Sequence, residues 1–415
     1  MAVPQAGLRY AMGIKMKVGI ITFHKVNNYG AVLQAYALQT TLQKLDCDCD
    51  IIDYNRKNFR DIVLWQKNKI KCFIKGKPDH QGYSNMEFIN MVLTTVFFNK
   101  KAVSGKFESF RGRYQLSRSV NSDTVKSLNK EYDLFISGSD QVFNCGRVIL
   151  DKNYLLDFVE TGEKKGSYAA SFGIKEIPDK YLKDYKELLS DFTYLSVREE
   201  TGADLIETLI GREAKVVLDP TLLLKKEEWA GLIGKKLKKE DVIIVYMLEY
   251  SESLLRYARE LSMRTNIPLR ILNKPFHHKL EEECRADVGP MEWLLEIQHA
   301  KYVVTNSFHG VAFSINFNRN FYVEIAEERI RGAMASRIEH ILKMFGLEDR
   351  LIRKAKSGNS KDKAVNLKYS STDIDYNKVN GKLEELRIDS IEYLRKMLKA
   401  DEGEQDLQIA AARSI

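Results

Sequence analysis

Short apolar runs alternate along this chain with longer segments whose apolar positions recur at helical spacing. The first run, 17–23, has the length and the branched side chains of a buried strand. In residues 31–45, Val32, Ala35, Leu38 and Leu42 fall on one face of a helix. Further strand-like runs are 50–54, 132–136, 167–171, 194–197 and 215–218, followed by 242–246, 269–272 and 302–304.

This alternation predicts an α/β fold with parallel sheets and crossover helices. A chain of 415 residues is too long for one ordinary core, so we expect two domains. The charged stretch 225–241 separates the two series of strands. It divides the chain into Rossmann-like domains at 16–225 and 226–400, the second ending in a helix at 377–399. Such domains face each other across a cleft at the carboxyl ends of their strands.

The polar residues 355–372 are expected to form a loop, and the tail beyond 401 to fray. Hydrophobic residues make up 44% of the chain and charged residues 29%, which is typical of a globular protein in water. The most apolar stretch, 88–98, is shorter than the ~20 residues that cross a bilayer. The five cysteines lack the spacing of a metal site. We therefore expect reduced thiols in the cytoplasm, with no metal and no cofactor.

The net charge of +8 is unevenly distributed. Residues 56–118, which interrupt the alternating pattern as an insertion, hold 14 Lys and Arg against 4 Asp and Glu. Their net charge of +10 leaves −2 for the rest of the chain. Apolar side chains are interleaved with the cations, which suits an anionic membrane surface or a phosphate-bearing partner. A solvated helix face is an equally good interpretation, and nucleic acid is a weaker one.

The most informative polar segment is 305–310, Thr-Asn-Ser-Phe-His-Gly, which lies between a predicted strand and a predicted helix. A helix start offers free backbone N–H groups and a positive dipole end, and anions bind there. His309 adds a group that carries a proton near neutral pH. The segment indicates a site that binds an anion and moves a proton. The alternative is a histidine that only caps or packs.

The loop after the first strand contains Asn27, Asn28, Tyr29 and Gly30. It lacks the G-x-G-x-x-G pattern, which argues against NAD or FAD. Gly30 permits a ligand to approach the backbone closely. The asparagines either contact that ligand or cap the following helix, and both interpretations remain open.

Three further strand ends carry polar side chains. Residues 137–144 combine hydroxyl, carboxylate and amide groups, which suits the mixed donors and acceptors of a sugar, and Asp140 is a candidate base toward a sugar hydroxyl. Arg198 is suited to a carboxylate or phosphate, unless it pairs with Glu199 or Glu200 instead. Asp219 adds a carboxylate, or else caps the turn that follows it.

Together these segments resemble the polysaccharide pyruvyl transferase family. The resemblance rests on 27–34, 138–144, 168–173, 196–199, 218–221 and 306–310, in this order over residues 17–350. It implies a fold similar to glycosyltransferase type B. It also implies transfer of pyruvate from phosphoenolpyruvate to two hydroxyls of a sugar, giving a cyclic ketal and phosphate. The acceptor would be a surface or capsular polysaccharide, or its lipid-linked precursor.

The resemblance also implies roles for individual residues. His309 matches the family's catalytic histidine, and Asp140 and Asp219 match acidic residues near the acceptor and the cleft. The expected contacts of phosphoenolpyruvate are Arg198, Asn306, Ser307, Gly310 and Arg337. The expected contacts of the acceptor are Asn28, Tyr29, Gly30, Gln34, Ser139 and Gln141.

Two positions depart from the family pattern. Ser307 stands where many members carry an arginine, so one cation for the substrate is missing, and Arg331, Arg337 or Lys274 are candidates to replace it. Ala31 stands where many members carry an aspartate. Two alternatives follow: a glycosyltransferase of the same fold that uses a nucleotide sugar, or a non-catalytic protein that binds a glycan.

Overall fold

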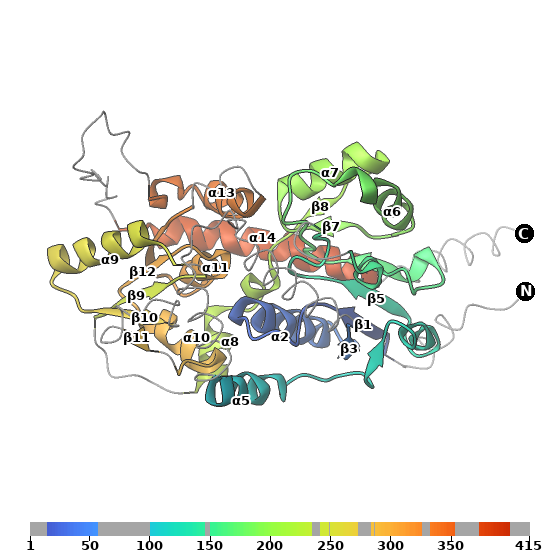
Figure 1. Ribbon diagram of the computed structural model, residues 1–415, viewed down its shortest axis with the longest axis horizontal. Coiled ribbons are helices and arrows are strands. Elements are labelled where there is room, and N and C mark those ends of the chain that lie inside the picture. Colours follow the sequence, from blue (N-terminus) through green and yellow to red (C-terminus); the bar gives the residue numbers. More distant parts are fainter. Residues whose placement is uncertain are drawn as a thin grey trace, which may run out of the picture.

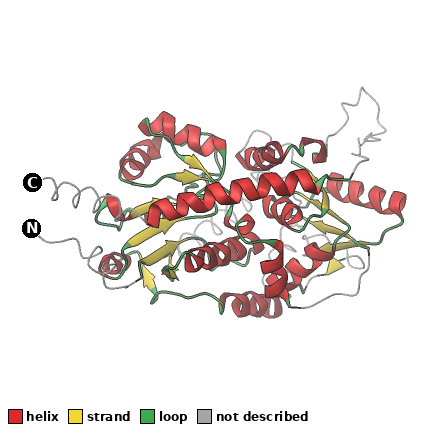
Figure 2. Cartoon of the chain, turned by 180° about the vertical axis from the view of Figure 1, so that it is seen from behind, coloured by secondary structure: helices red, strands yellow, loops and turns green. Residues whose placement is uncertain are grey.

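The computed structural model of the chain describes residues 15–56, 100–145, 150–234, 241–248, 250–272, 284–285, 287–325, 333–352 and 373–398. Two α/β halves lie side by side along the longest axis, and the helix α14 (Tyr376–Leu398) runs across both of them (Figure 1). Viewed from behind, α14 lies in front of the two sheets (Figure 2).

The N-terminal half is built on a parallel sheet in the order β2-β1-β5-β6. Its strands are β1 (Lys17–Ile21), β2 (Asp48–Ile51), β5 (Leu134–Ser137) and β6 (Lys165–Ser167). The pair β7 (Ser196–Val197) and β8 (Lys215–Val216) continues this sheet through single bridges from Gly166 to Tyr194 and from Ala170 to Val197. A smaller pair, β3 (Tyr54–Asn55) and β4 (Val120–Asn121), lies beyond β2 in the chain.

The C-terminal half holds a parallel sheet in the order β11-β10-β9-β12-β13. Its strands are β9 (Ile243–Tyr246), β10 (Leu269–Leu272), β11 (Cys284–Arg285), β12 (Tyr302–Thr305) and β13 (Asn320–Val323). The predicted α/β class with two parallel sheets is therefore confirmed. The boundary at 225–241 and the assignment of the last helix to the second domain stay predictions.

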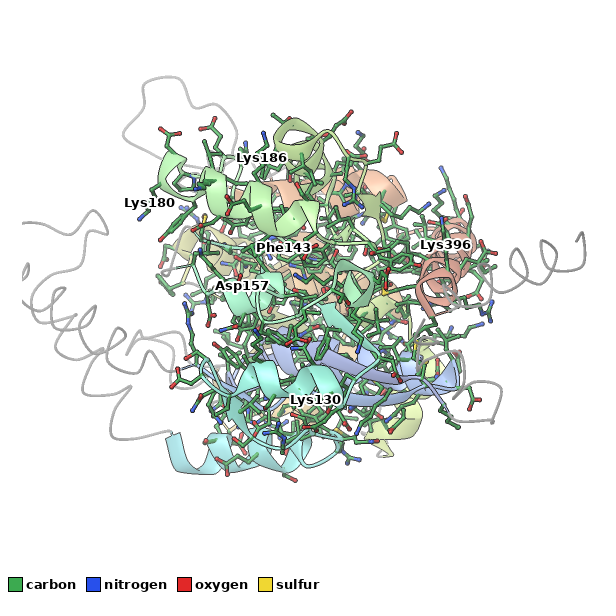
Figure 3. All side chains as sticks on the ribbon, turned by 90° about the vertical axis from the view of Figure 1, so that its right-hand side faces the viewer. Lys130, Phe143, Asp157, Lys180, Lys186 and Lys396 are labelled. Carbon is green, nitrogen blue, oxygen red and sulfur yellow. The ribbon has the colours of Figure 1, made fainter. Side chains whose placement is uncertain are left out.

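Helices cover both faces of each sheet. They are α2 (Tyr29–Lys44), α5 (Lys100–Arg111), α6 (Asp179–Ser190), α7 (Glu200–Ile210), α8 (Lys226–Ile233), α9 (Glu252–Thr265), α10 (Pro290–His299), α11 (Phe308–Asn316) and α13 (Ala333–Phe345). Figure 3 shows Phe143 inside the molecule, with Lys180 and Lys186 of α6 and Lys396 of α14 toward its periphery.

The alternation of side chains along each strand divides the core. Val18 and Ile20 of β1 belong to the large cluster that includes α2, whereas Ile21 faces the cluster beneath α6 and α7. In β9, Ile244 joins the first cluster and Val245 packs under α9. Because successive residues of a strand point to opposite faces, strands buried on both faces are apolar throughout. This explains why they are visible in the sequence as continuous apolar runs.

Several predicted boundaries were wrong. The helix expected at 31–45 begins at Tyr29, because the Asn28 side chain accepts a hydrogen bond from the Ala31 N–H and caps it there. The strand expected at 167–171 ends at Ser167, since Ala169 adopts a positive φ of 48°, which breaks the ladder. The strand expected at 50–54 is divided between β2 and β3. The strands β4, β11 and β13 were not predicted.

The two halves meet over an aromatic cluster beneath the site. Tyr29, at the start of α2, stacks on Trp293 of α10 at 5.3 Å between ring centroids and also contacts Phe107 of α5. Its hydroxyl donates to the Val288 carbonyl at 2.6 Å. Lys106 of α5 pairs with Glu292 of α10 at 3.0 Å. The end of the insertion 56–118 therefore joins the halves, while its part 57–99, like the expected loop 355–372 and the tail, lies outside the described residues.

Candidate active site

Four residues predicted from separate segments converge at one place. Asp140, Arg198 and Asp219 follow β5, β7 and β8, at the carboxyl ends of the N-terminal strands. His309 is the second residue of α11, directly after β12 of the other half. Parallel strands direct their carboxyl ends to one edge of a sheet, and the two sheets bring these edges together. The halves thus contribute different groups to a shared cluster.

Asp219 connects the other members of the cluster. Arg198 Nη1 donates to Asp219 Oδ2 at 2.7 Å, and His309 Nε2 lies 3.7 Å from the same oxygen. Arg198 Nη2 lies 3.7 Å from Asp140 Oδ1, and the guanidinium lies 4.5 Å from the centroid of the Phe308 ring. One guanidinium therefore holds two carboxylates and an aromatic face in fixed positions around the imidazole.

The other oxygen of Asp219 is also occupied. Its Oδ1 accepts from the Thr221 backbone N–H at 3.0 Å and from the Thr221 hydroxyl at 2.6 Å, so Asp219 caps the short helix η4 (Pro220–Leu222). Asp219 therefore both caps a helix and belongs to the cluster, so its two interpretations do not exclude each other. A carboxylate with both oxygens engaged is suited to orienting His309 and Arg198 rather than to accepting a proton.

The electrostatics keep Asp219 ionised. Burial alone would raise its pKa, but His309, the Arg198 guanidinium and the Thr221 hydroxyl together hold the pKa of Asp219 well below its usual range. Burial tends to lower the pKa of Arg198, and Asp219, Asp140 and Glu199 raise it overall. The cluster thus contains one guanidinium cation against three carboxylates, with the His309 imidazole beside Asp219.

Glu199 is a member of the cluster that sequence reasoning assigned only as an ion-pair alternative. It is buried, and its Oε1 accepts from the Ser171 hydroxyl at 2.7 Å. Its Oε2 lies 3.8 Å from Arg198 Nε. Ser171 lies within 168–173, one of the segments that carried the resemblance, so the polar residues at that strand end were the available signal. Phe308 was missed, although its position beside His309 places it in the same turn.

Gly30 permits the close approach of His309 to the start of α2. A Cβ at this position would lie 1.9 Å from His309 Nδ1, so a side chain here is incompatible with the imidazole position. The group that approaches the Gly30 backbone is therefore His309, where a ligand was expected. Because α2 begins at Tyr29 and α11 at Phe308, the N-termini of two helices lie close together here, which favours an anion.

The residues expected to contact the acceptor are mostly buried beneath the cluster. Gln34 donates to the Thr22 hydroxyl at 2.9 Å and accepts from the Ser139 N–H at 3.2 Å. Ser139 donates to the Ala169 carbonyl at 2.9 Å. With Tyr29 also held in the aromatic cluster, these side chains fix the loops that carry Asp140 and His309. Asn28 caps α2, as one of its two interpretations proposed.

Gln141 and Arg337 form a second contact between the halves. With its amide oxygen directed at α13, Gln141 accepts from the two terminal nitrogens of Arg337 at 3.0 and 3.1 Å. Arg337 is buried, and Gln141 is the direct neighbour of Asp140. Of the three cations considered as replacements at Ser307, Arg337 therefore lies beside the cluster, while Arg331 and Lys274 lie outside the described residues.

The remaining predicted residues shape the turn before α11. Asn306 Oδ1 accepts from the Leu248 N–H at 2.8 Å. Ser307 caps α11 by accepting from the Gly310 N–H at 3.3 Å. A Cβ on Gly310 would lie 2.5 Å from Thr305 Oγ1, so this position requires glycine for packing. The structure brings these residues to the cluster, and their contacts with a substrate stay predictions.

Across the residues that the structure describes, His, Cys, Asp and Glu side chains form no group of three or more suited to a metal ion. None of the helices in the described ranges has both the length and the apolar character needed to cross a membrane.

Comparisons with known proteins give one family. The sequence profile described as Polysaccharide pyruvyl transferase matches residues 28–324, which contain every cluster residue named above except Arg337. No curated protein matches the chain.

Several solved structures resemble this chain distantly, with low sequence identity and low TM-scores. UDP-GlcNAc 2-epimerase from Neisseria meningitidis bound to UDP-GlcNAc is 10% identical, covers 92% of this chain and 100% of its own, and has a TM-score of 0.41. The UDP-GlcNAc 2-epimerase from Methanocaldococcus jannaschii is 13% identical, covers 79% of this chain and 92% of its own, and has a TM-score of 0.39. E. coli heptosyltransferase WaaC with ADP is 11% identical, covers 75% of this chain and 88% of its own, and has a TM-score of 0.34. Likeness at this level carries no conclusion about ligands.

Proposed function

The chain belongs to the polysaccharide pyruvyl transferase family, and on this premise we propose that it transfers pyruvate from phosphoenolpyruvate to two hydroxyls of a sugar, releasing phosphate. The observation that carries the proposal is the position of His309. It lies 3.7 Å from a buried, ionised carboxylate, beside a guanidinium and at the start of two helices. This combination suits an acid that protonates an anionic substrate.

The first step uses His309 as the acid. The protonated imidazole gives its proton to the methylene carbon of phosphoenolpyruvate, and the carbon that bears the phosphate becomes an oxocarbenium-like centre. A sugar hydroxyl attacks that carbon, and Asp140 takes the hydroxyl proton. The negative charge of Asp219 and Asp140 stabilises the cationic centre as it develops. The product of this step is a tetrahedral adduct that still carries the phosphate.

The second step closes the ring. The second sugar hydroxyl attacks the same carbon and gives its proton to the now neutral His309, while the bond from that carbon to the phosphate oxygen breaks. Protonated Asp140 returns its proton to the leaving phosphate. His309 and Asp140 therefore end the cycle in the protonation states in which they began it. Asp219 takes no part in proton transfer, because both of its oxygens are engaged.

Binding of phosphoenolpyruvate needs more positive charge than Arg198 supplies, because three carboxylates already surround that guanidinium. The N-termini of α2 and α11 and the Arg337 guanidinium are the available additions. In this proposal Arg337 replaces the arginine that many members carry at the position of Ser307. Asn306, Ser307 and Gly310 present the backbone of the turn to the same anion.

The acceptor is proposed to be a sugar of a surface or capsular polysaccharide, or its lipid-linked precursor, approached from the side of Asp140 and Gln141. The protein would act in the cytoplasm, where phosphoenolpyruvate is made. The basic residues of 56–118 would hold it at the anionic inner face of the membrane. Binding to vesicles with anionic lipid that weakens as salt is added supports this location, and a failure to bind at low salt contradicts it.

The experiment that tests the function measures phosphate release from phosphoenolpyruvate, with and without candidate acceptor glycans. Release that requires the acceptor, together with a pyruvyl ketal on the product by mass spectrometry, is the expected result. In parallel, phosphoenolpyruvate should raise the melting temperature of the protein, because a ligand that binds only the native state stabilises it. Stabilisation by nucleoside diphosphates or nucleotide sugars alone would contradict the proposal and favour a glycosyltransferase.

A further inference from the structure

Two buried side chains outside the catalytic cluster join three segments of the chain. Asn316, the last residue of α11, donates from Nδ2 to the carbonyls of Thr221 and Leu224 at 2.9 Å each. Arg387 of α14 donates from Nε to the Leu222 carbonyl at 2.6 Å and from Nη2 to Asn316 Oδ1 at 3.2 Å. These five residues are called the α11–α14 junction. They connect η4 of one half with two helices of the C-terminal part of the chain.

The junction is directly continuous with the catalytic cluster. Thr221, whose carbonyl accepts from Asn316, also donates its N–H and its hydroxyl to Asp219 Oδ1. The helix α11 is therefore attached to the segment 219–224 at both of its ends. His309 faces Asp219 at the first end, and Asn316 binds Thr221 and Leu224 at the other. The two ends are about 10.5 Å apart along the helix axis.

The helix α14 holds the Asp219 turn from the other side. Ser390 Oγ accepts from the Leu218 N–H at 3.0 Å, and Arg387, one turn earlier, binds the Leu222 carbonyl. Asp219 therefore lies between two backbone groups that are bonded to one face of α14. All of these groups are buried, so an unmade hydrogen bond here is not replaced by water.

We propose that Asn316 and Arg387 are positioning residues that fix the separation of His309 and Asp219 across the two halves. The inference rests on the proposed pyruvyl transfer, because it assigns these residues a part in that reaction. Attachment at two points fixes both the translation and the rotation of α11 against η4. Loss of the second point leaves α11 attached to the segment 219–224 only through His309 and Asp219. A misplacement of about 1 Å in a catalytic group costs on the order of 10²-fold in rate.

The test compares Asn316→Ala with a control that removes a different contact of α11. The Tyr376 hydroxyl of α14 lies 3.2 Å from the Ser314 carbonyl of α11 and also contacts the Arg319 carbonyl, and both of these acceptors belong to the C-terminal half. Tyr376→Phe therefore removes a hydrogen bond to α11 without touching the junction. We expect both variants to melt at a lower temperature than the wild type. Only Asn316→Ala should lower kcat, by roughly 10- to 100-fold, with the KM for phosphoenolpyruvate nearly unchanged.

Variants of Arg387 add a graded series. Arg387→Lys keeps one donor for the Leu222 carbonyl and should retain more kcat than Arg387→Met, which keeps only the apolar stem. The proposal would be overturned if kcat fell in the same proportion to the decrease in melting temperature in all three variants, Tyr376→Phe, Asn316→Ala and Arg387→Met. That pattern would show that the junction only stabilises the fold.

A readout without turnover separates this inference from the proposed function. The NMR signals of the His309 ring, assigned by their loss in His309→Gln, should move in Asn316→Ala and stay in place in Tyr376→Phe. Unmoved signals in a folded Asn316→Ala protein would overturn the positioning role even if the wild type transfers pyruvate. Conversely, a wild type that releases no phosphate with any acceptor refutes the function, while the NMR comparison still decides the geometry.

Discussion

The two halves contribute opposite kinds of chemistry to one site. The strand ends of the N-terminal half supply the charged members of the cluster, in which one guanidinium (Arg198) lies among three carboxylates (Asp140, Glu199 and Asp219), so a net negative charge remains. The C-terminal half supplies a turn of neutral groups at the start of α11, and one histidine. Asp219 and Glu199 are held in place by Arg198 and by neighbouring hydroxyl groups, whereas Asp140 and His309 are the groups that move protons in the proposed reaction. The N-terminal half therefore sets the field and supplies the proposed base, and the C-terminal half supplies the proposed acid.

The largest effect is expected from removing His309, the histidine that the C-terminal half contributes. His309→Gln should lower acceptor-dependent phosphate release by about 10³-fold, within the range of general acid catalysis, because no other cluster member is placed to protonate the substrate carbon. Stopped or continuous phosphate assays measure it. The control is His299→Gln, on α10, where the imidazole contacts only the Leu295 carbonyl among the hydrogen bonds described. Full turnover in His309→Gln would refute the assignment.

Removing the cation should damage the N-terminal half as a structure. Arg198→Met leaves Asp219 and Glu199 buried without their guanidinium, and breaking a buried pair in this way costs about 3–5 kcal/mol. We expect this loss in urea unfolding, together with loss of the thermal stabilisation by phosphoenolpyruvate.

The matched variant for Arg198→Met is His309→Gln, which removes the imidazole that the C-terminal half contributes to the cluster. It should lose less unfolding free energy than Arg198→Met, since His309 Nε2 lies 3.7 Å from Asp219 Oδ2, whereas Arg198 Nη1 donates to the same oxygen at 2.7 Å. Equal losses in the two variants would contradict the division between a half that sets the field and a half that supplies the acid.

The contact between the halves is tested at Gly30. Gly30→Ala places a methyl group 1.9 Å from His309 Nδ1, so the imidazole or the start of α2 has to move. We expect a loss of about 1–3 kcal/mol, the range for overpacking, and a clear fall in kcat. Gly381→Ala in α14 is the control, because a Cβ there meets nothing within 4 Å. That control should gain about 0.5–1 kcal/mol.

The smallest effect is a dependence of stability on pH, which compares one histidine of each half, the buried His24 and the partly buried His340. Burial lowers the pKa of His24, after β1, and of His340, on α13. The unfolded chain takes up these protons near pH 6.5, whereas the folded protein resists them, so stability should fall as the pH is lowered through that value. Melting curves between pH 7.5 and 5.5 measure this. His24→Gln combined with His340→Gln should flatten the dependence, and an unchanged slope would contradict it.

The contribution of Asp219 to stability should also depend on pH, but through a carboxylate whose charged form is favoured by folding, and in a lower pH range. Its folded pKa is depressed, so the stability that it contributes is present above its unfolded value of about 3.9 and is lost as the pH falls toward the folded value. Asp219→Asn should therefore be less stable than the wild type at pH 7. The difference should shrink below pH ~4, as urea unfolding at several pH values would show.

The sequence by itself determined the fold class and the set of strand ends that carry chemistry. Strands such as β1 and β9 are buried on both faces, so their apolar runs mark them without reference to any partner. Short edge strands such as β11 and β13 lack this signal, because Arg285 and Asn320 interrupt it. The polar residues after each run were also visible, since a polar residue directly after a buried strand is conspicuous in the sequence.

Only the tertiary structure decided how these residues combine. The sequence separates Gly30 from His309 by most of the chain, and their steric contact exists only because the two halves close on each other. Nor does a local pattern reveal that Tyr29 is held by Val288, or that Asn316 and Arg387 meet at the carbonyls next to Asp219. Secondary structure follows from interactions between near neighbours in the chain. A catalytic geometry depends on the packing of whole helices, which the total of long-range contacts determines.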